Sequence, residues 1–133
     1  MKLNRAATLT VALGSIFLFS AAACAAQEPC SAAKLQGRYV FTGQGANLHY
    51  GAFAFDGAGK FTGKQTSSRE LANAERENLT GTYTLDADCT GTMTFETQQG
   101  RIEHWDVFVT NDGKKGRMIR TDQGVTAVRS FEQ

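Results

Sequence analysis

The chain has 133 residues, with 14 Lys or Arg against 13 Asp or Glu. Proteins that bind nucleic acid or an anionic membrane surface usually carry a strong excess of basic residues. This chain has no such excess, so no nucleic-acid partner is predicted. The three cysteines and two histidines show no metal-ligand spacing, and we expect neither a metal nor another cofactor.

The N-terminus has the pattern of a secretory signal peptide. Lys2 and Arg5 precede an apolar run over 6–19, and small residues follow it. Because a bilayer span needs about 20 apolar residues, this run is too short to stay as an anchor. We predict that 1–25, with an end set to within one or two residues, is removed to give a secreted or periplasmic protein without a membrane span. In the alternative, Cys24 is lipidated and the protein is an anchored lipoprotein.

The rest of the chain reads as a short tail, 26–36, followed by one domain, 37–133. Short runs of aromatic and β-branched residues alternate with Gly-rich turns, which is the pattern of consecutive strands joined by tight connections. Asp56-Gly57 is a strong hairpin signal between two such runs. The predicted strands, in chain order, are 37–42, 48–55, 60–66, 79–85, 90–97, 101–110, 117–121 and 125–131.

The segment 67–78, "SSRELANAEREN", interrupts this pattern. Its Arg, Glu and Ala residues favour one or two helical turns, although a single Leu is little to anchor a helix. A long mobile loop, or extensions of the flanking strands that pair as a tall hairpin, fits equally well.

Alternation within the strands predicts one buried and one wet face. Phe53 and Phe55, Tyr83, Met93 and Phe95 fall on buried faces, opposite Thr-rich outer faces. Flat, such a sheet would expose two edges, and closing it removes both. We therefore predict an all-β fold, a single small antiparallel up-and-down β-barrel of about eight strands. Further residues expected to point inward are Phe41, Phe61, Trp105, Val107, Val109, Ile119 and Val128.

Loss or lipidation of Cys24 leaves Cys30 and Cys89, an even number for an oxidising compartment. We predict a Cys30–Cys89 disulfide that ties the tail 26–36 to the corner between two strands.

Four stretches resemble a set of short exported bacterial proteins of uncharacterised role: "LQGRYVFTGQG", "FAFDGAGKFTG", "LTGTYTLDADCTGTMTF" and "MIRTDQGVTAV". The similarity runs from Leu35 to Phe131 and implies a calycin-like, that is lipocalin-type, barrel. The G-x-W of true lipocalins is replaced here by Gly37-Arg38-Tyr39. The shared motifs are turn glycines, core aromatics and the corner cysteine, so the resemblance implies a fold and no catalytic residue.

A small barrel has room for one ligand or for its own side chains. The sequence-based candidates for ligand contact are Arg120, which would offer a carboxylate-binding group if it pointed inward, and five residues that the alternation places inside or at the mouth: His49, Phe53, Tyr83, Phe95 and Trp105.

Other polar residues are weaker candidates. His104 and Asp106 share a strand face opposite Trp105, so they point to water if Trp105 points inward. Arg38, Arg117 and Arg120 would supply a carboxylate-binding group if they pointed into the barrel, but we expect them to face outward, because charged groups are seldom fully buried. No catalytic set is assembled from these residues.

The leading functional hypothesis is a non-enzymatic binding module for a small apolar ligand or an envelope partner. One alternative is a protein–protein interaction or inhibitor module that uses loop 67–78 and the barrel rim. The other is a cyclase- or isomerase-like barrel enzyme, although the polar residues supply no nucleophile, base and orienting group together.

Overall fold

The computed structural model describes residues 27–70 and 72–133. The predicted signal peptide 1–25 and Cys24 lie outside the described residues. A short 3-10 helix, η1 (Ala32–Lys34), precedes eight strands. The strands are β1 (Gln36–Gln44), β2 (Leu48–Asp56), β3 (Lys60–Ser68), β4 (Glu75–Leu85), β5 (Thr90–Thr97), β6 (Ile102–Val109), β7 (Lys115–Arg120) and β8 (Val128–Glu132).

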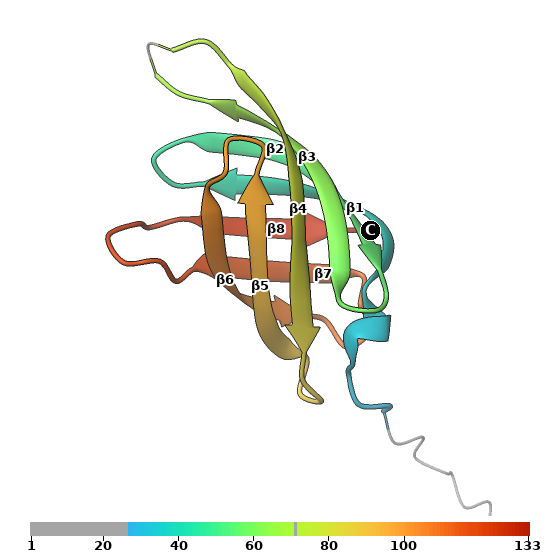
Figure 1. Ribbon diagram of the computed structural model, residues 1–133. Helices are drawn as coiled ribbons and strands as arrows, with labels where there is room; N and C mark the ends of the chain where they lie inside the picture. Colours follow the sequence, from blue (N-terminus) through green and yellow to red (C-terminus); the bar gives the residue numbers. More distant parts are fainter. Residues whose placement is uncertain (1–26, 71) are drawn as a thin grey trace, which may run out of the picture.

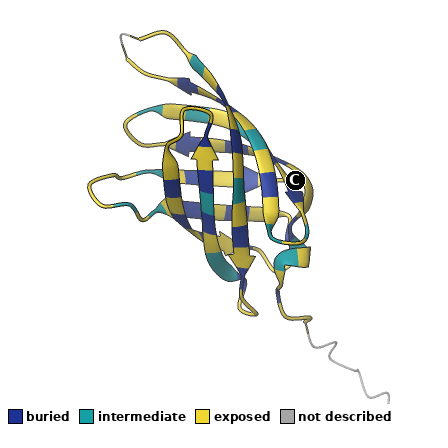
Figure 2. Ribbon diagram, in the orientation of Figure 1, coloured by how far each residue is buried: buried dark blue, intermediate teal, exposed yellow. Residues whose placement is uncertain are grey.

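The strands form one closed barrel in chain order, with every neighbouring pair antiparallel (Figure 1). Closure comes from pairing of the last strand with the first, where Phe41 lies opposite Phe131. The predicted all-β, up-and-down barrel of eight strands is therefore confirmed. Burial alternates along each strand, so bulky side chains fill the interior and Thr-rich faces meet water (Figure 2).

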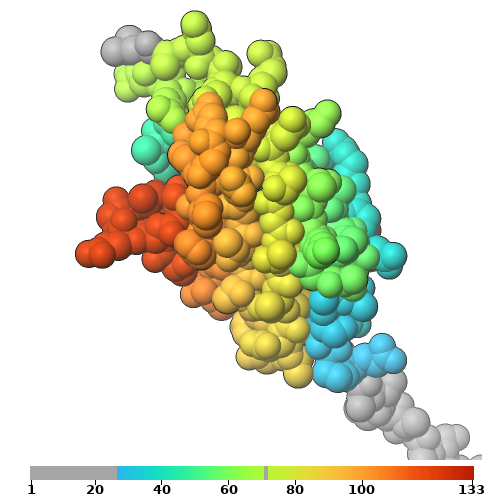
Figure 3. Space-filling model, in the orientation of Figure 1, coloured from blue at the N-terminus to red at the C-terminus, as the bar shows by residue number. Residues whose placement is uncertain are grey.

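The segment 67–78 is a tall hairpin. β3 continues to Ser68 and β4 begins at Glu75, with Ser67 paired opposite Glu75. Strand extension was one of three structures that the sequence left open, and it is confirmed. The hairpin projects beyond its neighbours at the top of the molecule (Figure 3).

Two predicted core residues point the other way. Ile119 is 45 % exposed and Val128 is 47 % exposed, so their inward placement was wrong. Their chain neighbours Met118 and Arg129 lie inside instead, at 2 % and 3 % exposure. The bulk of Phe131 explains the register, because turning Phe131 inward also turns Arg129 inward two residues earlier.

Aromatic rings fill the middle of the barrel. Phe53 is fully buried, with its ring centre 4.3 Å from that of Phe41 and 5.4 Å from that of Phe61. Gly51 makes room for Phe41 on the paired strand, because a Cβ there would overlap the Phe41 ring and the backbone oxygen of Lys64. The middle of the barrel is therefore filled by side chains.

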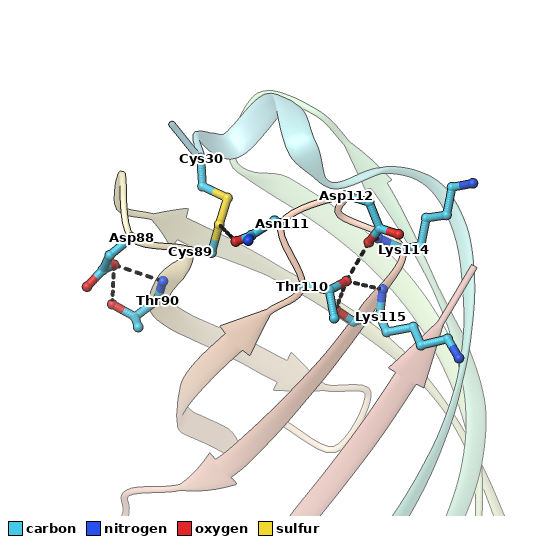
Figure 4. Close-up of a disulfide and its surroundings, with 9 residues drawn as sticks. All are labelled: Cys30, Asp88, Cys89, Thr90, Thr110, Asn111, Asp112, Lys114 and Lys115. Atoms are coloured by element: carbon cyan, nitrogen blue, oxygen red, sulfur yellow. Dashed lines mark hydrogen bonds between the residues drawn. A yellow bond between two sulfur atoms is a disulfide. The ribbon is translucent and has the colours of Figure 1, made fainter. Parts of the chain in front are cut away.

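One end of the barrel is sealed by the tail. The Tyr83 hydroxyl lies 2.8 Å from the Ala32 carbonyl oxygen and 3.0 Å from that of Leu35, and Leu35 is fully buried. Cys30 and Cys89 form a disulfide, which confirms the predicted pairing (Figure 4). Cys89 sits in the left-handed region at the β4–β5 corner, with φ of 66°. The bond therefore fastens the tail across this end.

Candidate functional site

The opposite end of the barrel is open and polar. The β1–β2, β3–β4, β5–β6 and β7–β8 hairpins surround this mouth, on the side away from η1 (Figure 1). Just inside, the inward positions carry polar side chains instead of aromatic ones. We call these residues, together with Arg101 of the β5–β6 turn, the mouth cluster; the inward members are His49, Gln65, Ser67, Glu77, Glu103, Arg120 and Arg129.

Arg129 on β8 is a deeply buried charge, with its side chain 2 % exposed. Its guanidinium carbon lies 4.8 Å from the centre of the Trp105 ring and 4.9 Å from that of Phe41. Its Nη1 donates to Gln65 Oε1 at 2.9 Å, and its Nη2 lies 3.7 Å from Glu103 Oε2. Burial lowers the pKa of Arg129 to about 10, against the effect of Glu103, so the side chain stays charged at neutral pH.

Six members of the mouth cluster form one continuous chain of polar contacts, and His49 and Ser67 form a separate pair. Arg101 Nη2 donates to both carboxylate oxygens of Glu77 at 3.1 Å, and Gln65 Nε2 donates to Glu77 Oε2 at 2.9 Å. Gln65 passes the chain to Arg129, which contacts Glu103. Glu103 Oε1 lies 3.4 Å from Arg120 Nη1. Such a network holds each member in a single orientation, because releasing one leaves its partner buried and unpaired.

A pocket of about 170 Å³ opens among these residues. At roughly 30 Å³ per liquid water, that is space for about five waters or a small organic molecule. His49, Ser67 and Trp105 line it, together with residues of the β1–β2 and β7–β8 turns. The charged residues that line it are Arg69, Arg101, Glu103, Arg120 and Arg129.

Three buried atoms around the pocket have no hydrogen-bond partner among the described residues. They are Glu103 Oε2, Trp105 Nε1 and Arg129 Nε, and all three residues line the pocket. A buried polar group without a partner costs about 1–3 kcal/mol. Stable proteins contain few such groups, and a cluster of three beside one pocket is a reason to look for a ligand there.

The pocket carries a positive potential. Four guanidinium groups line it against one carboxylate, while Glu77 and Asp122 lie behind the arginines that they contact. His49 responds to this potential: burial, followed by the charges of Arg129, Arg101, Arg69 and Arg120, lowers its pKa to about 4. The imidazole is therefore neutral at pH 7, with Nδ1 at 2.8 Å from Ser67 Oγ.

This shift predicts an acid-sensitive fold. The folded pKa of His49 lies below the ordinary 6.5, so the unfolded chain binds more protons between these values. Stability contributed by His49 is complete above pH 6.5 and is lost as the pH falls toward 4. We expect urea denaturation midpoints to decrease across this window, and His49→Gln to flatten the decrease. His104→Gln, which alters an exposed histidine, is the matched control; an unchanged slope in His49→Gln would contradict the assignment.

The six sequence candidates divide into two groups. His49, Trp105 and Arg120 line the pocket. Phe53 is buried in the middle of the barrel and Tyr83 is buried at the sealed end, while Phe95 stacks on Trp105 at 5.9 Å beneath the pocket. The structure therefore brings half of the candidate set together at the mouth.

Sequence reasoning missed Arg129, Glu103, Arg101, Glu77 and Gln65. A signal for most of them was present, because each shares the inward phase of an aromatic or aliphatic neighbour two residues away. Glu103 is in phase with Trp105, Glu77 with Leu79, and Arg129 with Phe131. Charges in phase with core residues at strand ends facing one mouth are the pattern that identifies this site.

The other polar candidates lie outside the barrel. His104 is exposed as expected, and its Nδ1 contacts Asp122 Oδ1 at 2.7 Å instead of pairing with Asp106. Arg38 and Arg117 are exposed. A shallow hollow of about 950 Å³ also lies on the outer faces of β1, β2 and β6 to β8, beside the exposed rings of Tyr50 and Phe108.

Searches with this chain found no matching protein-family model, no matching curated protein and no matching solved structure. Within the described residues, no helix is long and apolar enough to cross a membrane. The same residues contain no group of three or more His, Cys, Asp or Glu side chains placed to hold a metal ion.

Proposed function

We propose that this protein is a binding module whose ligand is a small oxyanion, such as a short carboxylate, held in the mouth pocket. The observation that carries the proposal is the lining: four arginines and one glutamate around about 170 Å³. Guanidinium groups offer carboxylates a rigid fork of N–H donors and cannot lose their charge at neutral pH.

The ligand chemistry differs from the apolar ligand that the composition suggested. Phe53, Tyr83 and Phe95 are buried and fill the apolar part of the interior. An apolar ligand would have to displace these side chains. The polar mouth has the remaining space and an excess of N–H donors. Within the described residues, Arg101 uses only Nη2 in hydrogen bonds, which leaves its other nitrogens for an incoming anion.

Calorimetric titration of the disulfide-bonded protein with methanesulfonate and with acetate, at about pH 5 and about pH 7, tests the proposal. Arg120→Gln removes one guanidinium from the wall, and we expect at least about tenfold weaker binding, since charge-assisted hydrogen bonds contribute about 1.5–3 kcal/mol. Arg117→Gln, on the outer face of the same strand, is the matched control and should bind as the parent does. The proposal would be overturned if neither anion bound, or if Arg117→Gln lost as much affinity as Arg120→Gln.

The proposal includes export. The leader-like pattern over 1–25 and the Cys30–Cys89 disulfide support an oxidising compartment outside the cytoplasm. The intact mass of protein recovered from producing cells distinguishes cleavage near Ala25 from lipidation of Cys24. The number of strands and their up-and-down order support kinship with the calycin-like barrels.

The alternatives keep their place as hypotheses. The β3–β4 hairpin stands free of the barrel body, as a contact surface for an envelope protein or an inhibitory role would require (Figure 3). A cyclase- or isomerase-like reaction would have to use His49 beside the arginines. The titration separates these possibilities from simple anion binding, because neither alternative requires a saturable anion site.

A further inference from the structure

We infer that an anion entering the mouth pocket brings a proton with it, which is taken up by His49, so that the site binds in acid and releases near neutral pH. This inference rests on the proposed anion-binding function and adds its regulation. It starts from the balance of charges around the pocket.

Every arginine at the pocket already has a carboxylate partner. Arg129 and Arg120 contact Glu103, and Arg120 also donates to Asp122 at 2.7 Å. The other two pairs are Arg101 with Glu77 at 3.1 Å and Arg69 with Glu75 at 3.9 Å. Four arginines therefore face four carboxylates, although the arginines stand nearer the cavity. An added anion leaves this group with one negative charge in excess.

His49 is the remaining proton acceptor in the lining. It lies on β2, with the arginines of β7, β8 and the β3–β4 and β5–β6 turns around the same cavity. The charged and titratable groups that face it across the packed elements are Arg69, Arg101, Glu103, Arg120 and Arg129, with Glu77 behind Gln65. The carboxylates Glu75, Glu77 and Glu103 each contact a guanidinium group.

The geometry also gives the added proton a use. His49 Nδ1 is engaged with Ser67 Oγ at 2.8 Å. When the ring takes a proton from solvent, both ring nitrogens carry hydrogen, so Nδ1 donates to Ser67 and Nε2 becomes a second cationic donor. The imidazolium then adds a positive charge where the anion has added a negative one.

The arginines that oppose protonation of His49 also set the direction of coupling. Burial first, and then the charges of these arginines, lower the pKa of His49 to about 4. A bound anion offsets their field, so protonation becomes easier, and by reciprocity protonation makes the anion bind more tightly. One coupled proton makes the association constant increase by up to about tenfold for each pH unit of acidification within the window between the two pKa values.

The test is calorimetric titration of the disulfide-bonded protein with methanesulfonate, an anion that stays ionised throughout, from about pH 4.5 to about pH 7.5. Repeating each titration in buffers of different ionisation enthalpy counts the protons taken up. We expect an uptake that approaches one proton and affinity that falls as the pH rises. His49→Gln should bind with little pH dependence and no uptake, whereas His104→Gln should behave as the parent.

A second measurement does not depend on the His49 variant folding. The protein has two histidines, so nuclear magnetic resonance titration of the ring nitrogens follows both. We expect methanesulfonate to raise the pKa of His49 and to leave the ring-nitrogen signals of His104 unchanged at each pH.

The outcomes separate the two proposals. No binding at any pH overturns the proposed function and this inference together. Binding without proton uptake, at an affinity independent of pH, overturns this inference and leaves the proposed function standing. Proton uptake that persists in His49→Gln overturns the assignment to His49.

Discussion

Replacing Arg129 with Met is expected to lower the free energy of unfolding by about 3 kcal/mol, the lower end of the roughly 3–5 kcal/mol seen when one partner of a buried ion pair is removed. The substitution keeps the apolar stem but removes the donor to Gln65 and the cation that faces Glu103. Glu103 keeps its contact with Arg120, which limits the loss. Chemical denaturation monitored by Trp105 fluorescence measures the change.

Two further variants separate the buried charge from general loss of an arginine. Arg117→Met alters an exposed arginine and should change stability by less than about 0.5 kcal/mol. Adding Glu103→Met to Arg129→Met removes the carboxylate that has lost one of its two arginine contacts and should restore part of the loss. An additive double variant, more unstable by the sum of the two single changes, would contradict the idea that the two charges depend on each other.

Removing the disulfide is expected to cost about 4 kcal/mol, because the bond closes a loop with a sequence separation of 59 residues. The variant is the double substitution Cys30→Ser with Cys89→Ser, and thermal and urea denaturation measure its effect. Parent protein kept reduced is the control for the serine side chains and should agree with the variant. A loss below about 1 kcal/mol would mean that the hydrogen bonds of Tyr83 hold the tail without the bond.

The sequence predicted the barrel well because a closed small barrel imposes strict alternation. β5 has the predicted bounds, and the tall hairpin was one of the alternatives left open. The place of Cys89 at a corner follows from the two flanking strands, whereas its pairing with Cys30 was predicted from the number of cysteines left for an oxidising compartment. These features depend on local pattern, and local pattern is visible in the chain.

The candidate site was predicted only in part, because it needed the register of the last strands. Met118 and Ile119 are adjacent, so either could point inward, and Val128 and Phe131 are out of phase with each other. Preferring Ile119 and Val128 placed Arg129 outside. The general rarity of buried charges favoured the same choice. Only the closed barrel, in which Arg129 meets Gln65 across the interior, shows why a charge is tolerated there.

The sealed end also determines how the molecule presents itself when it is tethered. Gln27 to Lys34 lead into this end, and the last residue, Gln133, lies there too, with its side chain donating to the Gln36 carbonyl oxygen. A lipid on the N-terminal side, or a linker fused to the C-terminus, would therefore attach the protein through its sealed end. The mouth would then face away from the surface to which the protein is tethered, toward the medium from which small solutes arrive.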